Sequence, residues 1–187
     1  MRKLLTALLY FVFGVIVSII VGFSVYGQDI LSTTNNCFHF ISLGMTGAII
    51  LALVRLYRAW VAAIFILVLL ILMVGPLLIL KLPLAAILFY MLWYMGAGYT
   101  IFGMGCLFKA KIQRLPIGKF LLLGIALAIL YIVKTFLIHI PITKPIPVTE
   151  IISNAILGLL VGGSLGLGTE IGELLDRLVC KEIGTNP

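Results

Sequence analysis

Six apolar runs fill most of this chain, and each is long enough to cross a lipid bilayer. A helix rises about 1.5 Å per residue, so about 20 residues cover a hydrocarbon layer of about 30 Å. Most of the runs contain no charged residue inside. The sequence therefore predicts an all-α polytopic integral membrane protein with six transmembrane helices. The predicted spans are Leu4–Tyr26, Cys37–Val54, Ala59–Leu80, Leu84–Phe108, Phe120–Ile140 and Ile151–Glu173.

The amino-acid composition supports this class and argues against a soluble domain. Of the 187 residues, 63% are hydrophobic and only 10% are charged, whereas a soluble domain is about 25% charged. A chain of this composition could not cover its own core with polar surface. We therefore expect a single transmembrane domain over residues 1–187, without a nucleotide-binding or other soluble domain.

The basic residues predict the orientation of the spans, because positively charged loops stay on the cytoplasmic side. With a cytoplasmic N terminus, ten of the 13 Lys and Arg residues fall inside, two fall outside, and Lys134 lies within the fifth span. This asymmetry explains the net charge of +7 without a nucleic-acid partner. We expect a multi-pass protein of the plasma (cytoplasmic) membrane, which is the inner membrane of a cell with two membranes. Both termini are expected to lie inside. The ten inside are Arg2, Lys3, Arg55, Arg58, Lys109, Lys111, Arg114, Lys119, Arg177 and Lys181, and the two outside are Lys81 and Lys144.

Lys134 is the most informative residue within a predicted span. An ionisable group in the bilayer is costly and marks a functional site by default, although the lysine stem could also reach the outer surface by snorkelling. Glu150 likewise has a second explanation, because a carboxylate in the first turn of a helix is stabilised by the helix dipole. Together with polar residues of the outer half, Lys134 is interpreted as part of a binding site for a small polar or anionic solute. The predicted substrate-binding residues are Lys134, His139, His39, Asn154 and Glu150.

Polar residues in the middle and inner parts of the spans are mostly expected to satisfy themselves, through backbone carbonyls or a neighbouring helix. Three acidic residues near the end of the last span could bind a cation. We interpret them instead as a solvated helix end, in which Glu173 pairs with Arg177 four residues later. The deeper polar residues are Thr6, Ser18, Thr46, Tyr94, Tyr99, Thr100 and Ser164, and the acidic ones are Glu170, Glu173 and Asp176.

No catalytic, metal or cofactor site is predicted. His39 and His139 are the two histidines and lie near the outer surface, whereas Ser164 lies in the inner half, so a serine nucleophile would lack a base. The histidines could ligate a haem, or zinc together with Glu150. Both sit at span ends, however, and their spacing matches no ligand pattern. We therefore expect neither enzymatic activity nor a bound cofactor.

Glycines recur at intervals of four residues in the last span, at Gly158, Gly162 and Gly166. Helices in lipid associate through close backbone approach at small residues. This face is therefore predicted to pack against another helix or to dock other membrane subunits.

These features favour a small transport component that binds its solute in the outer half of a six-helix bundle. It has no ATP-binding segment, so it would need partner subunits as well as the lipid bilayer. In size, in its six spans, in its two cytoplasmic ends and in its opening Leu4–Leu9, the chain resembles the substrate-binding membrane subunits of energy-coupling-factor vitamin transporters. That resemblance implies solute capture for partner subunits and assigns no residue a role.

The alternative is a non-catalytic accessory or scaffold subunit whose glycine faces hold other membrane proteins together. The side chain of Lys134 distinguishes the two functions. A scaffold predicts that Lys134 points to the lipid headgroups, whereas a solute-binding protein predicts that it faces the bundle interior near His139 or Asn154.

Overall fold

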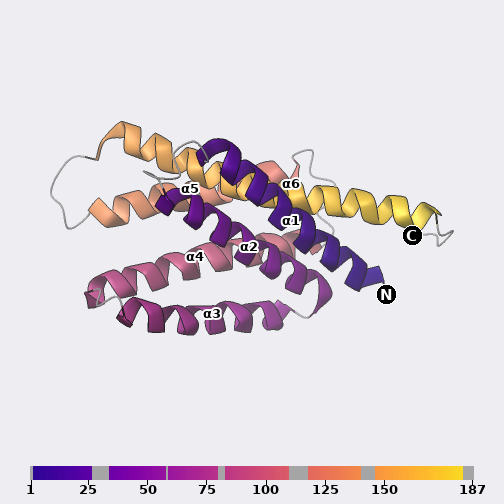
Figure 1. Cartoon of the computed structure of the whole chain (residues 1–187), viewed down its shortest axis with the longest axis horizontal. Helices are drawn as coiled ribbons and strands as arrows, with labels where there is room; N and C mark the ends of the chain where they lie inside the picture. Colours follow the sequence, from indigo (N-terminus) through magenta and orange to yellow (C-terminus); the bar gives the residue numbers. More distant parts are fainter. Residues whose placement is uncertain are drawn as a thin grey trace.

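The computed structural model describes residues 2–26, 34–57, 59–79, 83–109, 118–139 and 146–182, and its regular elements there are six α-helices (Figure 1). The all-α class is therefore confirmed. Most helix ends lie close to the predicted span ends, but α6 continues to Glu182 instead of ending at Glu173. The helices are α1 (Arg2–Tyr26), α2 (Thr34–Leu56), α3 (Ala59–Ile79), α4 (Leu84–Lys109), α5 (Lys119–His139) and α6 (Val148–Glu182).

Within the described residues, four of the helices are long and apolar enough to span a membrane, namely α1, α4, α5 and α6. In α2 and α3, the apolar stretches among the residues whose side chains the structure describes are Ser42–Leu56 and Ala59–Leu72. Large apolar side chains also cover the outside of the bundle, such as Ile71 at 70% and Leu92 at 63% exposure. Apolar surface of this extent is suited to contact with lipid rather than with water.

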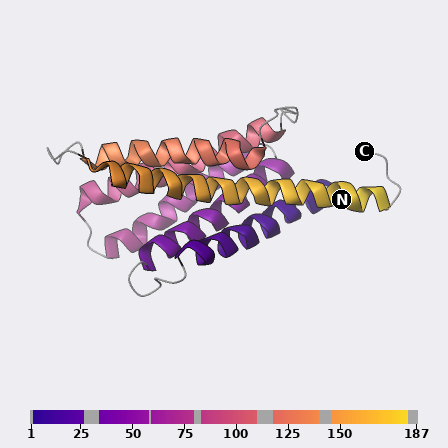
Figure 2. The same ribbon diagram turned by 90° about the horizontal axis from the view of Figure 1, so that it is seen from above.

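The helices lie side by side in a bundle with α6 between α1 and α5 (Figure 2). Helix α2 packs against α1 and α4, and α3 lies at one edge against α4 and α2 (Figure 1). Both chain termini lie at the same end, which we call the termini end, and we call the opposite one the far end. The start of α1 and the last part of α6 extend beyond the other helices at the termini end (Figure 1).

Backbone contacts at glycine join α6 to both of its neighbours. A Cβ atom added to Gly158 would lie 2.6 Å from a backbone carbonyl oxygen of α5, and one added to Gly168 would lie 2.6 Å from the Cα of Gly14 on α1. Gly162 and Gly166 approach the backbone of α5 even more closely. These glycines are therefore occupied by the chain's own helices, and a partner subunit would have to bind another surface.

Helices α3 and α4 are held by side chains rather than by backbone contact. Ile66 and Leu70 of α3 and Ala97 and Ile101 of α4 are buried in the common core. At Gly98 on α4, the nearest atom to an added Cβ would be the Cγ2 of Ile66, at 3.1 Å. Helix α6 thus packs against α1 and α5 through backbone contacts, whereas α3 and α4 are separated by their side chains.

Candidate functional site

A cavity of about 280 Å³ lies between α2, α3 and α4. Its lining comes from the middle of each helix, which would place it well inside the bilayer rather than at either surface. Gly98 contributes no side chain to the wall formed by α4, which leaves room beside Ile66. The lining residues are Ser42, Leu43, Thr46, Ile50, Ile66, Leu69, Leu70, Tyr94, Gly98 and Ile101.

The hydroxyl groups of the cavity gather toward the far end of the bundle. Ser42 and Thr46 are four residues apart and therefore lie on one face of α2, and Tyr94 reaches the cavity from α4. The side chains of Tyr94 and Ser42 are hydrogen-bonded to each other. Within the part of the chain that the structure describes, the hydroxyl of Thr46 makes no hydrogen bond. The cavity therefore offers a small polar end and an otherwise apolar body.

Several other hydroxyl groups within the apolar helices form the hydrogen bonds that the sequence predicted. Thr100 donates a hydrogen bond to the carbonyl oxygen of Gly96 at 2.8 Å, one turn earlier in α4. Ser164 donates to the carbonyl oxygen of Val161 at 2.8 Å, and its Oγ lies 3.2 Å from that of Ser18 on α1. These hydroxyls are satisfied within the bundle, which distinguishes them from Thr46.

A cluster of polar residues at the termini end connects three helices through hydrogen bonds and an ion pair. The Tyr10 hydroxyl on α1 donates a hydrogen bond to one carboxylate oxygen of Glu173 on α6, and Lys119 at the start of α5 forms an ion pair with the other. The carboxylate of Glu170 accepts a hydrogen bond from the backbone N–H of Lys119. It thereby caps α5, because the first N–H groups of a helix have no partner within it. We call Tyr10, Lys119, Glu170 and Glu173 the polar network.

The sequence-based prediction of a solvated helix end is wrong for these acidic residues. Asp176 is only 5% exposed, and the side chains of Glu173 and Lys119 are each 13% exposed. Glu173 pairs with Lys119 on another helix, while Arg177, its expected partner, has an exposed side chain. The reason is that α6 continues alongside α1, so one face of its last turns stays covered.

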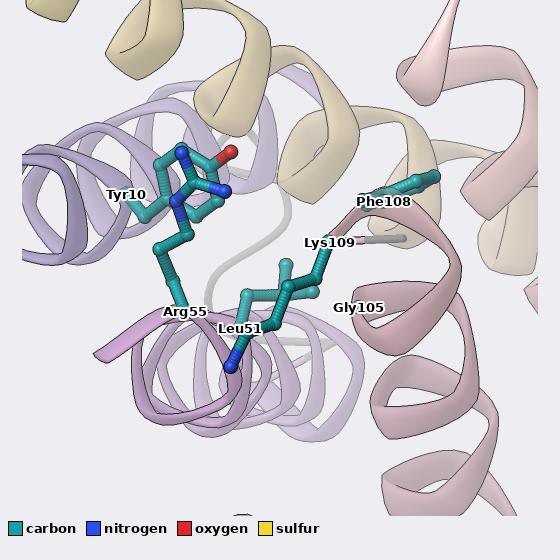
Figure 3. Close-up of a pocket in the computed structure, with 6 residues that line it drawn as sticks. All are labelled: Tyr10, Leu51, Arg55, Gly105, Phe108 and Lys109. Atoms are coloured by element: carbon teal, nitrogen blue, oxygen red, sulfur yellow. The ribbon is translucent and has the colours of Figure 1, made fainter. Parts of the chain in front are cut away.

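Two basic residues of the termini end are also engaged by neighbouring helices. Arg55 extends from the end of α2 toward Tyr10, whereas the ammonium group of Lys109 lies along the end of α2 (Figure 3). Lys109 Nζ donates hydrogen bonds of 2.8 Å to the carbonyl oxygens of Val54 and Tyr57, so it caps the C-terminus of α2. The space among these residues is about 10 Å³, which suits a single water molecule. The contacts of Lys109 attach α4 to α2, and a space of about 10 Å³ is too small for a solute larger than water.

Lys134 faces the inside of the bundle between α5 and α4. Its Nζ lies 4.6 Å from the ring centroid of Trp93 and 5.4 Å from that of Tyr131. The two rings meet edge to face, with centroids 4.6 Å apart and planes at 83°. Cation–π contact with buried aromatic rings stabilises a charge that is partly removed from water. Trp93 and Tyr94 are consecutive in α4 and point about 100° apart around its axis, and among the described residues the cavity lining includes Tyr94 but neither Trp93 nor Lys134.

The other predicted site residues are only partly placed. Asn154 and Glu150 are half-buried in the first turns of α6, whereas Lys134 lies against the aromatic rings of Trp93 and Tyr131. The side chains of His39 and His139 lie outside the described residues. Sequence reasoning did not identify Trp93 and Tyr131 as the surroundings of Lys134, since no spacing along the chain links α4 to α5.

Comparisons with protein-family models, with curated proteins and with solved structures give no match for this chain.

Proposed function

We propose that this chain is a membrane-embedded transport component that binds a small solute in the cavity between α2, α3 and α4. In this proposal all six helices cross the membrane, and partner subunits supply the energy for transport. The observation that carries the proposal is the cavity of about 280 Å³ with its hydroxyl groups at one end. Small-molecule sites are typically mostly apolar, with a few placed polar groups.

The arrangement of the helices also supports a binding function. The cavity lies where α3, an edge helix, meets α2 and α4, and these contacts are made by side chains. Glycine-based backbone contacts, in contrast, hold α6 to α1 and α5. A displacement of α3 would therefore open the cavity without breaking the closely packed part of the bundle.

A cavity-filling substitution tests this proposal with a matched control. Leu69 lines the cavity, whereas Leu67, two residues earlier in α3, is 46% exposed on the outside of the bundle. The purified protein, Leu69→Trp and Leu67→Trp would be melted with riboflavin, thiamine, biotin, menadione, decanol and decanoate. Saturation at about 100 times the dissociation constant should raise the melting temperature by about 5 °C or more.

We expect one or more of these solutes to stabilise the parent protein and Leu67→Trp but not Leu69→Trp. The indole fills the space that the solute needs only when it replaces Leu69. Equal stabilisation of both tryptophan variants would place the solute elsewhere, and stabilisation of none of the three proteins would reject the binding function.

The proposed orientation has the far end outside and the termini end in the cytoplasm. It is supported by Arg55, Lys109 and Lys119, which all lie at the termini end. After replacement of the native cysteines by serine, Thr33→Cys should react in intact cells with a membrane-impermeant maleimide, and Arg114→Cys should react only after lysis. The opposite labelling pattern would reverse the orientation.

A second candidate function is an accessory subunit that binds other membrane proteins. The observation in its favour is the exposed apolar surface in the last turns of α6, where Leu174 is 58% and Leu178 is 51% exposed. Leu174 and Leu178 are one helical turn apart and present one apolar face. Stable copurification of a defined membrane protein that is lost in Leu174→Ser with Leu178→Ser, combined with no solute binding, would favour this function.

A further inference from the structure

We infer that the cavity between α2, α3 and α4 takes a neutral amphiphile with one hydroxyl or carbonyl group and an apolar body. This inference rests on the proposed solute-binding function and names the chemical class of the solute. It differs from the polar or anionic solute that the sequence alone suggested, and it follows from three properties of the cavity: its volume, its lack of charge and the position of its hydroxyl groups.

The volume of the cavity limits the size of the ligand. Benzene, with six carbon atoms, binds in an engineered apolar cavity of about 150 Å³. In proportion, the cavity of about 280 Å³ in this protein holds about 11 non-hydrogen atoms. A molecule the size of decanol matches this number, whereas a large vitamin such as riboflavin exceeds it.

The lining excludes a permanently charged ligand. None of the described cavity residues is Lys, Arg, His, Asp or Glu, and Lys134 lies against Trp93 outside the cavity lining. An ion placed here would lose its hydration without gaining a partner of opposite charge, which is strongly unfavourable in an apolar interior. A carboxylate or an ammonium head would therefore bind less well than a neutral head on the same chain.

The hydroxyl groups set the orientation of the ligand. Thr46 offers a hydroxyl that is not used within the described residues, and the hydrogen-bonded pair of Ser42 and Tyr94 lies at the same end. Toward the termini end the cavity is bounded by Ile50 and Ile101, which are buried and apolar. The polar group of the ligand therefore faces Thr46, and its hydrocarbon part points toward Ile50 and Ile101.

A series of compounds with the same carbon chain tests this assignment on the full-length protein in detergent. Decanol, decane, decanoate and decylamine would be titrated against the parent protein while its melting temperature is recorded. The Leu69→Trp variant supplies the baseline for effects outside the cavity. We expect decanol to stabilise the parent above this baseline, decane to do so more weakly, and the two charged compounds not to do so.

Thr46→Val tests the role of the hydroxyl, because valine has nearly the shape of threonine and cannot form the hydrogen bond. We expect decanol to bind Thr46→Val between about twofold and tenfold more weakly, with the affinity for decane unchanged. Thr100→Val is the matched control on α4, since the Thr100 hydroxyl is already bonded to its own helix. A loss of decanol affinity in the control equal to that in Thr46→Val would overturn the assigned orientation.

The remaining outcomes separate this inference from the proposed function. If decanoate, decylamine or a vitamin stabilises the parent but not Leu69→Trp, the cavity binds a solute and the assigned chemical class is wrong. If no compound distinguishes the parent from Leu69→Trp, the chemical class and the binding function are both rejected.

Discussion

Gly162→Ala is expected to lower the free energy of unfolding by about 3 kcal/mol and the melting temperature by about 6 °C or more. A Cβ at residue 162 would lie 2.6 Å from the carbonyl carbon of Leu123 and 2.8 Å from the Cα of Gly124. Both obstacles belong to the backbone of α5, so no side-chain rotation can relieve the clash. Helices α5 and α6 would have to separate along their contact. Thermal unfolding of the purified variant in detergent measures the loss.

Two other glycines provide controls for this substitution. A Cβ on Gly163, the next residue, would meet its nearest atom at 3.9 Å, and one on Gly103 would meet nothing within 4 Å. Gly163→Ala and Gly103→Ala should stay within about 0.5 kcal/mol of the parent. A similar loss of stability in all three variants would mean that the loss does not come from the close contact of Gly162 with the backbone of α5. Unchanged stability of Gly162→Ala would show that α5 and α6 do not touch there.

The helices were predictable because their lengths are set locally. Apolar runs of about 20 residues follow from the thickness of the bilayer, and turns or charged residues separate one run from the next. The exception is the end of α6, which continues past Glu173 to Glu182. The last turns of α6 pack against α1, and this contact cannot be inferred from composition.

The contacts of the polar residues were less predictable, because they depend on which helices become neighbours. Glu173 had a sequence-local partner in Arg177, yet the structure gives it Lys119 from another helix. Lys134 was correctly identified as a residue of interest, but Trp93 on α4 could not be chosen in advance as its contact. Pairing rules within one helix say nothing about the rotation of a neighbouring helix.

The cavity could not have been found from the sequence at all. Thr46 and Tyr94 were grouped with hydroxyl residues that satisfy themselves, and this is true of Thr100. A cavity is the volume left unfilled by three helices, so it depends on side-chain packing across α2, α3 and α4 together. Neither Thr46 nor Leu69 carries a local signal that separates it from a residue in contact with lipid.

Lys119→Met is expected to lower the free energy of unfolding by about 3 kcal/mol, because it leaves the carboxylate of Glu173 without its ion-pair partner. Both side chains of this pair are 13% exposed, so water can screen the remaining charge only in part. The ion pair and the hydrogen bond from Tyr10 join α5, α6 and α1. Their loss should reduce the melting temperature by about 6 °C or more.

The double variant Lys119→Met with Glu173→Gln separates the effect of an isolated charge from that of lost packing. Removing both charges of a buried pair is often nearly neutral, and glutamine can still accept the hydrogen bond of Tyr10. We therefore expect the double variant to recover most of the stability lost in Lys119→Met. Arg177→Ala should stay within about 0.5 kcal/mol of the parent, since this exposed side chain is not the partner that holds Glu173. A larger loss of stability in Arg177→Ala than in Lys119→Met would indicate that Glu173 pairs with Arg177 within α6. It would contradict the attachment of α5 to α6 through Glu173.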